Sequence, residues 1–123
     1  MGIFTQEMTK ITVIEVAGTE CCVAARDGQK VHDRIRAAFC ESRSVEVSFE
    51  GISDITPAFL NSAVGQLYGS IPADGIEINI SFTDIPKEDE FILKRIIERA
   101  KTYFENAYSC RKVISDELGG EDV

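Results

Sequence analysis

Two adjacent cysteines, Cys21 and Cys22, are the residues whose type and position most readily suggest covalent chemistry. A cysteine acts as a nucleophile or redox sensor when a nearby base lowers the pKa of its thiol. His32, the single histidine of the chain, follows in the next predicted helix and could supply that base. One hypothesis is therefore a cysteine-based redox sensor or thiol enzyme. The alternative is structural, because cysteine among small apolar residues packs as a small hydrophobic side chain.

Other patterns that would indicate an enzyme or a metal site do not occur in the sequence. The remaining cysteines, Cys40 and Cys110, complete no C-x-x-C pair, and one histidine cannot supply the spacing of a zinc site. There is also no glycine-rich phosphate loop, no Ser-His-Asp order and no H-E-x-x-H motif. We therefore expect no metal and no cofactor, and we favour a protein that is not an enzyme.

The stretch from residue 51 to residue 60 offers a second kind of chemistry, at the start of a helix. Thr56 can accept a hydrogen bond from a free N–H of the first turn, and Pro57 suits the first helical position because it lacks an N–H. A helix N-terminus also favours negative charge, so a phosphate added to Ser53 or Thr56 could be read there by a partner. The alternative is that Thr56 is only a cap and Ser53 only a turn residue.

The elements on either side hold this turn in place. Residues 45–50 alternate between apolar and polar side chains, which predicts a strand with one buried face. The helix predicted over 56–69 carries an apolar stripe that consists of Leu60, Ala63, Val64, Leu67 and Tyr68, and Gly69 can end it. Phe59 lies off this stripe.

The run VEVSFEGISDITPAFLNSAVGQLYG, within residues 44–70, resembles the STAS-like domain family of unknown function (DUF4325). The resemblance rests on the hydrophobic strand, the G-I-x-x-I turn, the helix start with Phe59, and the glycine in the helix; weaker similarity extends it to residues 20–85. The family comprises bacterial and phage proteins and is related in fold to the STAS domains of anti-sigma factor antagonists. The resemblance implies a STAS-like fold and a regulatory role through protein–protein interaction.

In STAS antagonists a partner kinase phosphorylates a serine or threonine at the start of the equivalent helix. The position so modified falls here on Pro57 or Ala58, which have no hydroxyl group, and the preceding aspartate falls on Thr56. Thr56 and Ser53 are therefore the candidate phosphorylation sites that remain. By analogy, the implied partner is a GHKL-type ATPase or a histidine-kinase-like protein.

We accordingly predict a regulatory interaction module that docks its partner through the 51–60 turn and the following helix. The candidate partner-binding residues are Ser53, Asp54, Thr56 and Phe59. Phe59 is expected to be an exposed anchor because it lies off the apolar stripe; the alternative is that it packs inward. A homodimer is a further possibility, through an edge strand or the long C-terminal helix.

The rest of the chain completes a predicted β-(β)-α-β-α-β-α order. Strands are expected at 11–16, with a start near Thr9, at 20–25 and at 76–82. A helix is expected from a turn at 26–28, with Asp27 as its cap, to about residue 41, and a long helix from 87 to about 108. Basic residues from Lys94 to Lys101 are expected near the negative end of that last helix. The order predicts an α/β fold, a small mixed sheet of about four strands with three to four helices.

Length and composition bound these hypotheses. A chain of 123 residues suits a single domain, predicted over 1–115, followed by an acidic, disordered tail over 116–123. The net charge of −8 argues against nucleic-acid binding, which needs clustered basic residues, and favours a basic partner surface. No apolar run is long enough to span a membrane, and the first ten residues do not form a signal peptide. We expect a cytoplasmic protein with reduced thiols.

Overall fold

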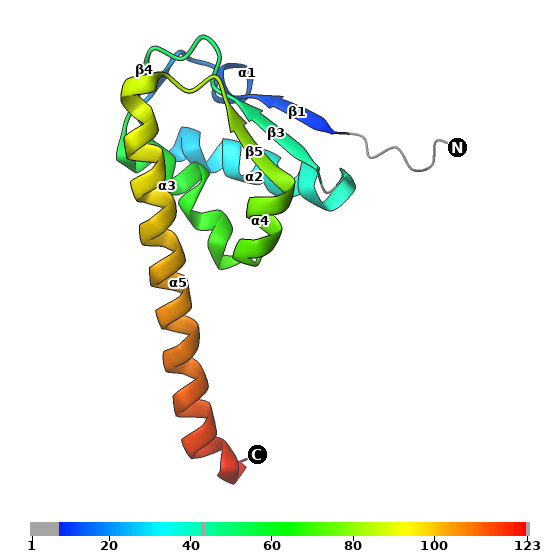
Figure 1. The fold of residues 1–123 in the computed structure, drawn as a ribbon, viewed down its shortest axis with the longest axis vertical. Helices are drawn as coiled ribbons and strands as arrows, with labels where there is room; N and C mark the ends of the chain where they lie inside the picture. Colours follow the sequence, from blue (N-terminus) through cyan, green and yellow to red (C-terminus); the bar gives the residue numbers. More distant parts are fainter. Residues whose placement is uncertain (1–7, 43, 123) are drawn as a thin grey trace, which may run out of the picture.

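The computed structural model describes residues 8–42 and 44–122, and it describes only the backbone of Ser42 and of residues 107–122. Figure 1 shows helices and strands alternating along most of the chain. The elements are β1 (Thr9–Thr12), α1 (Val13–Ala17), β2 (Cys21–Cys22), α2 (Ala25–Ser42), β3 (Val45–Ser48), β4 (Asp54–Ile55), α3 (Pro57–Ala63), the 3-10 helix η2 (Gly65–Gly69), α4 (Ala73–Asn79), β5 (Ile80–Thr83) and α5 (Lys87–Asp122). The predicted α/β class is confirmed.

Three strands form a parallel sheet in the order β1-β3-β5, and each strand has four residues. The two-residue strands β2 and β4 form a separate parallel pair, in which Cys21 lies opposite Asp54 and Cys22 opposite Ile55. The sequence predicts about four strands in one mixed sheet, so the count and the grouping of the strands differ. The small pair matters for function because β4 leads directly into the turn before α3.

One face of the three-stranded sheet contributes to the hydrophobic core. Val45 and Val47 of β3 are fully buried, and they pair in register with Ile80 of β5 and Ile11 of β1, which are also buried. Helix α2 contacts β1 and β3, and α3 packs against α2. The two helices approach closely at Gly28, where a Cβ atom would lie 2.5 Å from a backbone oxygen of α3.

The turn predicted at 26–28 is wrong, because these residues are helical. Helix α2 already begins at Ala25, so Gly28 lies inside its first turns, and Asp27 is in the first turn rather than before it. A glycine at this position costs helix stability relative to alanine but removes the side chain that would hold α2 and α3 apart. Its role is helix packing.

The first predicted strand, over 11–16, is also only partly correct. β1 ends at Thr12, opposite Ser48, the last residue of its neighbour β3. The chain then forms the short helix α1, which closes at Gly18 with φ of 78° and a hydrogen bond from the Gly18 N–H to the Ile14 carbonyl. The apolar run after Thr12 packs into the core as a helix.

The strand predicted over 76–82 is wrong in its first half. The chain forms α4 up to Asn79, and only the last part enters the sheet as β5. Ile76 is buried while Ile78 is 78% exposed, so the alternating isoleucines do not share one face. The sheet limits the strand length, because β3 has only four residues with which β5 can pair.

The predicted central helix over 56–69 is divided into α3 and η2, with Val64 between them. Gly65 begins η2, and a Cβ atom there would lie 2.7 Å from the Asn61 side-chain oxygen and 3.4 Å from Ile96 of α5. The close neighbours of Gly65 are therefore on α3 and α5. The break between α3 and η2 thus lies where both elements pack against α5.

Helix α5 forms one side of the body and then extends well beyond it (Figure 1). Leu93, Ile96 and Ala100 of its first half are buried against the body. The backbone stays helical to Asp122. Helix α5 therefore contains three features that the sequence predicts elsewhere: the helix end near residue 108, the domain boundary at 115 and most of the tail over 116–123. Pro86 is the last proline of the sequence, so no later residue lacks a backbone N–H for helical hydrogen bonding.

In the part of the chain that is described, none of the helices combines the length and the apolar character that crossing a membrane requires.

Candidate functional site

The turn before α3 is held in place by backbone hydrogen bonds to the segment around β2. The N–H groups of Ser53 and Asp54 both donate to the Glu20 carbonyl, at 2.9 and 3.3 Å, and the Thr56 N–H donates to the Cys22 carbonyl at 3.1 Å. These bonds flank the pairing of β2 with β4. The turn therefore has a fixed backbone, although it lies at the surface.

Thr56 caps α3 as the sequence predicts. Its hydroxyl oxygen accepts a hydrogen bond from the Phe59 N–H at 3.2 Å, and Pro57 occupies the first helical position. The same hydroxyl donates to the Val23 carbonyl at 2.9 Å. Thr56 thus uses its hydroxyl as both donor and acceptor, and it ties α3 to the segment after β2.

Ser53 and Asp54 are both exposed and are held more loosely through their side chains. The Ser53 hydroxyl donates to the Glu20 carbonyl at 3.3 Å, and the Asp54 carboxylate accepts from the Cys21 thiol at 3.6 Å. The first contact is long and the second comes from a thiol, which is a weak donor, so each side chain can turn toward a partner at little cost. Ser53 is the hydroxyl of this turn that a modifying enzyme could reach without breaking a helix cap.

Phe59 is not the exposed anchor that the sequence predicts. Its side chain has no exposed surface and belongs to the hydrophobic core together with its neighbour Leu60. The prediction fails because α3 is packed on two sides, against α2 and against α5. A helix held between two others buries more than one narrow stripe, so Phe59 is inside although it lies off the stripe.

The exposed residues from Ser53 to the end of α3 are Ser53, Asp54, Pro57, Ala58 and Asn61, and we call them the turn surface. They lie on backbone that the β2–β4 pair and the Thr56 cap hold in place. No residue of this set is large and apolar. The turn surface is small and polar, with a single charge from Asp54.

The N-terminus of α5 adds negative charge close to the turn. Desolvation, followed by the negative charges of Glu88 and Asp54, raises the pKa of Asp89 above its ordinary value. The smaller, electrostatic part of this shift means that Glu88 and Asp54 each lie near enough to Asp89 to repel its carboxylate. The β4 end of the turn surface is therefore acidic.

A family model described as a STAS-like domain of unknown function (DUF4325) matches residues 27–90, just over half of the chain. The chain belongs to this family. No curated protein and no solved structure matches it. The matched range runs from the start of α2 into the start of α5, so the STAS-like segment contains the whole turn surface and lies C-terminal to both Cys21 and Cys22.

The structure separates the two cysteines that precede the STAS-like segment. Cys22 is fully buried, and desolvation, with smaller effects from the charges of Asp27 and Cys21, raises the pKa of its thiol to about 11. A raised pKa leaves little thiolate at neutral pH and disfavours nucleophilic chemistry. Cys21 is exposed and donates to Asp54.

His32 does not act on either cysteine in this arrangement. It is buried on α2, where its Nδ1 atom lies 3.3 Å from the Gln29 amide nitrogen and 3.2 Å from the Asp33 carboxylate. Within residues 8–42 and 44–106, no hydrogen bond links it to a cysteine, and no three His, Cys, Asp or Glu residues are grouped as a metal site. Cys110 lies where side chains are not described. The thiol hypothesis thus gains no support from the geometry.

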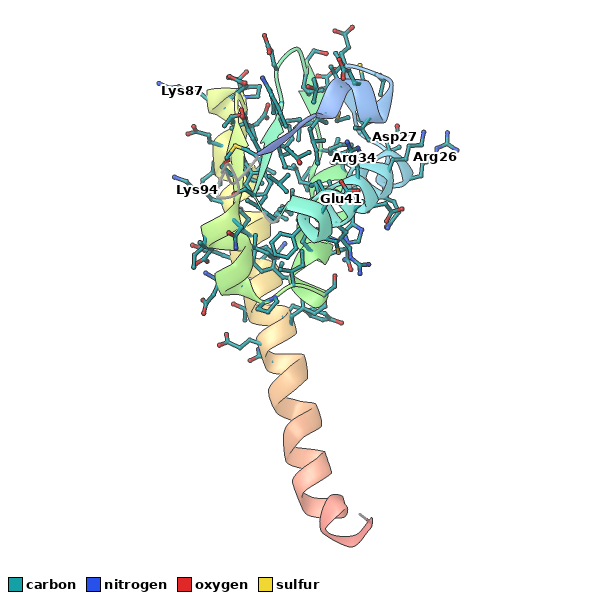
Figure 2. All side chains as sticks on the ribbon, turned by 90° about the vertical axis from the view of Figure 1, so that its right-hand side faces the viewer. Arg26, Asp27, Arg34, Glu41, Lys87 and Lys94 are labelled. Atoms are coloured by element: carbon teal, nitrogen blue, oxygen red, sulfur yellow. The ribbon has the colours of Figure 1, made fainter. Side chains whose placement is uncertain are left out.

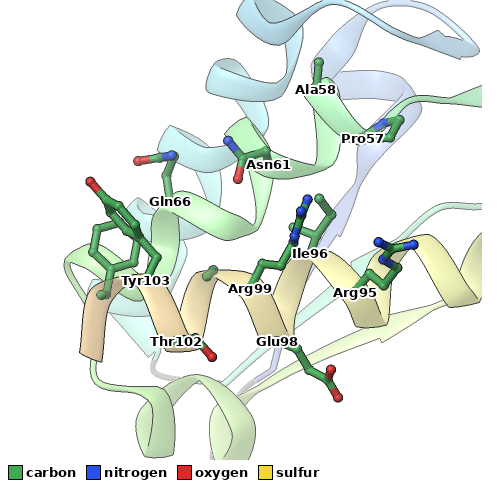
Figure 3. A pocket seen from close by; sticks show the side chains of 12 residues that line it. Pro57, Ala58, Asn61, Gln66, Arg95, Ile96, Glu98, Arg99, Thr102 and Tyr103 are labelled. Carbon is green, nitrogen blue, oxygen red and sulfur yellow. The ribbon is translucent and has the colours of Figure 1, made fainter. Parts of the chain in front are cut away.

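Sequence reasoning assigned no function to Arg95 and Arg99, because it placed them near the negative end of a shorter helix. Since α5 runs from Lys87 to Asp122, both arginines lie in its first half, far from that end. They face α3 across a groove instead (Figure 3). Their spacing of four residues, which places two like charges on one face of a helix, is the sequence signal that could have identified them.

Proposed function

We propose that this STAS-like protein is a non-enzymatic regulatory module that docks a protein partner through the turn surface. The observation that carries the proposal is the combination of a fixed backbone with exposed, loosely held side chains. Ser53 and Asp54 are exposed on a turn, and their backbone N–H groups donate to the Glu20 carbonyl. A preorganised surface loses less conformational entropy on binding than a mobile loop. Exposed residues on a rigid support are the usual arrangement of recognition sites.

The electrostatics favour a partner with a basic contact surface. Asp54, Glu88 and Asp89 gather negative charge at the β4 end of the turn, and the protein as a whole carries a net charge of −8. Complementary charge speeds association and selects against acidic partners. The family relationship supports, by analogy, a GHKL-type ATPase or histidine-kinase-like partner in the cytoplasm.

Phosphorylation of Ser53 is the form of regulation that best fits this turn. Adding phosphate to Ser53 would break only the long hydrogen bond to the Glu20 carbonyl, whereas adding it to Thr56 would remove the α3 cap and the bond to Val23. A phosphate on Ser53 would also stand next to the Asp54 carboxylate and increase the negative charge that the partner meets. Ser53 is therefore preferred to Thr56 as the modified residue.

Affinity capture from native cell lysate, with and without ATP, tests the proposal. The bait is compared with an Asp54→Lys variant, and Asp74→Lys, which reverses an exposed carboxylate on α4, is the matched control. The wild type and Asp74→Lys should retain a specific partner that Asp54→Lys loses, while circular dichroism shows all three folded. Equal capture by the three baits, or recovery of the bait protein alone, would overturn docking at the turn surface.

A further inference from the structure

A groove of about 1050 Å³ lies between α3 with η2 on one side and α5 on the other (Figure 3). Pro57, Ala58 and Asn61 of the turn surface line its α3 side. Arg95, Arg99 and Tyr103 line its α5 side, so the groove shares its α3 wall with part of the turn surface. Docking at the turn would bring a partner next to this groove.

The groove carries positive charge in an otherwise acidic protein. Arg95 and Arg99 are exposed, and neither forms a salt bridge with any side chain that the structure describes. Glu98 also lines the groove, but in Figure 3 its carboxylate points away from α3, whereas the guanidinium groups of Arg95 and Arg99 lie on the side of α5 that faces α3. The guanidinium of Arg95 lies 5.7 Å from the ring centre of Phe91, which helps to hold it in place.

Two unpaired arginines one turn apart on one helix face repel each other and weaken the helix slightly. Their position in the first half of α5 gives them no favourable interaction with the negative helix end. A carboxylate bound between Arg95 and Arg99 would relieve this repulsion, and guanidinium groups bind carboxylates with paired hydrogen bonds. The charge therefore points to an anionic occupant.

The remaining lining indicates that the occupant also has apolar side chains. Ile96 and Ala100, which are buried against the body, form part of the wall, and Tyr103 is 65% exposed beside them. From Arg95 to Phe104 the helix rises roughly 13 Å, and the groove is open to solvent along that length. Small molecules bind in pockets that enclose most of their surface, whereas an open groove between helices suits a peptide segment.

We infer that this groove binds an acidic peptide segment of the partner, with carboxylates paired to Arg95 and Arg99 and an apolar side chain against Ile96 and Ala100. The inference rests on the proposed function, since it defines the chemistry of the partner that docks at the turn surface. The partner would then present a basic contact to Asp54 and an acidic segment to the groove. A contact surface that carries both an acidic and a basic region fixes the orientation of the partner in the complex.

Fluorescence anisotropy with two labelled synthetic peptides tests this inference. One is a short amphipathic helical peptide with glutamates four residues apart beside a leucine, and the other has a lysine for each glutamate. The wild type should bind the acidic peptide about tenfold more tightly than the basic one, because each partly shielded ion pair contributes about a threefold factor. A protein of net charge −8 without such a site would show the opposite preference.

A double variant, Arg95→Glu with Arg99→Glu, should lose the preference for the acidic peptide. The matched control is Arg34→Glu with Lys94→Glu, which gives the same net charge at two exposed sites outside the groove, on α2 and α5 (Figure 2). The control should keep the wild-type preference. A wild type that prefers the basic peptide, or equal loss in the two double variants, would overturn the inference. Full displacement of the acidic peptide by inorganic phosphate at constant ionic strength would also overturn it, because the site would then recognise a small anion.

The peptide assay tests the groove ligand and the lysate capture tests docking at the turn, so either claim can be excluded without the other. If Asp54→Lys abolishes capture but the wild type does not prefer the acidic peptide, docking at the turn stands and the acidic groove ligand is excluded. If the wild type prefers the acidic peptide but Asp54→Lys captures normally, the groove binds its ligand and docking at the turn is excluded.

Discussion

Replacing Phe59 by alanine tests whether α3 is packed as the structure shows. The side chain is fully buried in the core, between α2 and α5, so its removal leaves a cavity that the surrounding helices can fill only in part. Deleting a buried phenylalanine costs about 3–5 kcal/mol. A domain of this size has a free energy of unfolding of about 5–15 kcal/mol, so the loss would lower Tm by roughly 10–20 °C.

The assay is urea and thermal unfolding followed by circular dichroism, and the chain offers a matched control. Phe91 on α5 is 64% exposed, so Phe91→Ala should cost less than about 1 kcal/mol, mostly its contact with Arg95. A loss at Phe59→Ala no larger than that at Phe91→Ala would refute the reasoning. That result would also support the prediction from the sequence that Phe59 is an exposed anchor for a partner.

Three further changes test the structure around the turn. Gly28→Ala places a Cβ atom 2.5 Å from a backbone oxygen of α3 and should lower the free energy of unfolding by about 1–3 kcal/mol. In the control Gly75→Ala the nearest neighbour of the Cβ atom would be at 3.4 Å, so the free energy of unfolding should stay unchanged or rise by up to about 1 kcal/mol. Similar urea midpoints for the two variants would contradict the close packing of α2 against α3. Thr56→Ala removes the α3 cap and should lower the free energy of unfolding by about 1–2 kcal/mol, while Ser53→Ala should change it by less than about 0.5 kcal/mol. Equal effects of the two substitutions in urea unfolding would exclude a special role for the Thr56 cap. Because burial raises the pKa of the Cys22 thiol to about 11, iodoacetamide should label Cys22 much more slowly in the folded protein than in urea at neutral pH. Rapid labelling of Cys22 itself in the folded protein, located by peptide mass spectrometry, would contradict this pKa.

The features predicted correctly from the sequence are those that depend on neighbouring residues. Thr56 caps α3 and Pro57 occupies its first position because capping involves atoms within three residues of each other. The strand at Val45 and the α/β class follow from periodicity in the same way. The STAS-like resemblance is confirmed by the family match over 27–90.

The errors concern properties that the rest of the fold decides. Ile78 alternates with its neighbours as in a strand, but the four residues of β3 leave it no partner, and it is an exposed helix residue. Phe59 lies off the apolar stripe, but a second helix packs on its side of α3. Arg95 and Arg99 belong to a groove only because α3 lies across from them. Periodicity along one segment contains none of this information.

Site-specific photo-crosslinking in the native cell tests the central claim, docking at the turn surface, most directly. A photoreactive amino acid is placed at Ser53, an exposed residue of the turn surface that does not line the groove, or at Ala37, an exposed alanine on α2 outside it. The account predicts one discrete crosslinked partner from position 53 and none from position 37. Crosslinking to the same proteins from both positions, or only from position 37, would contradict it.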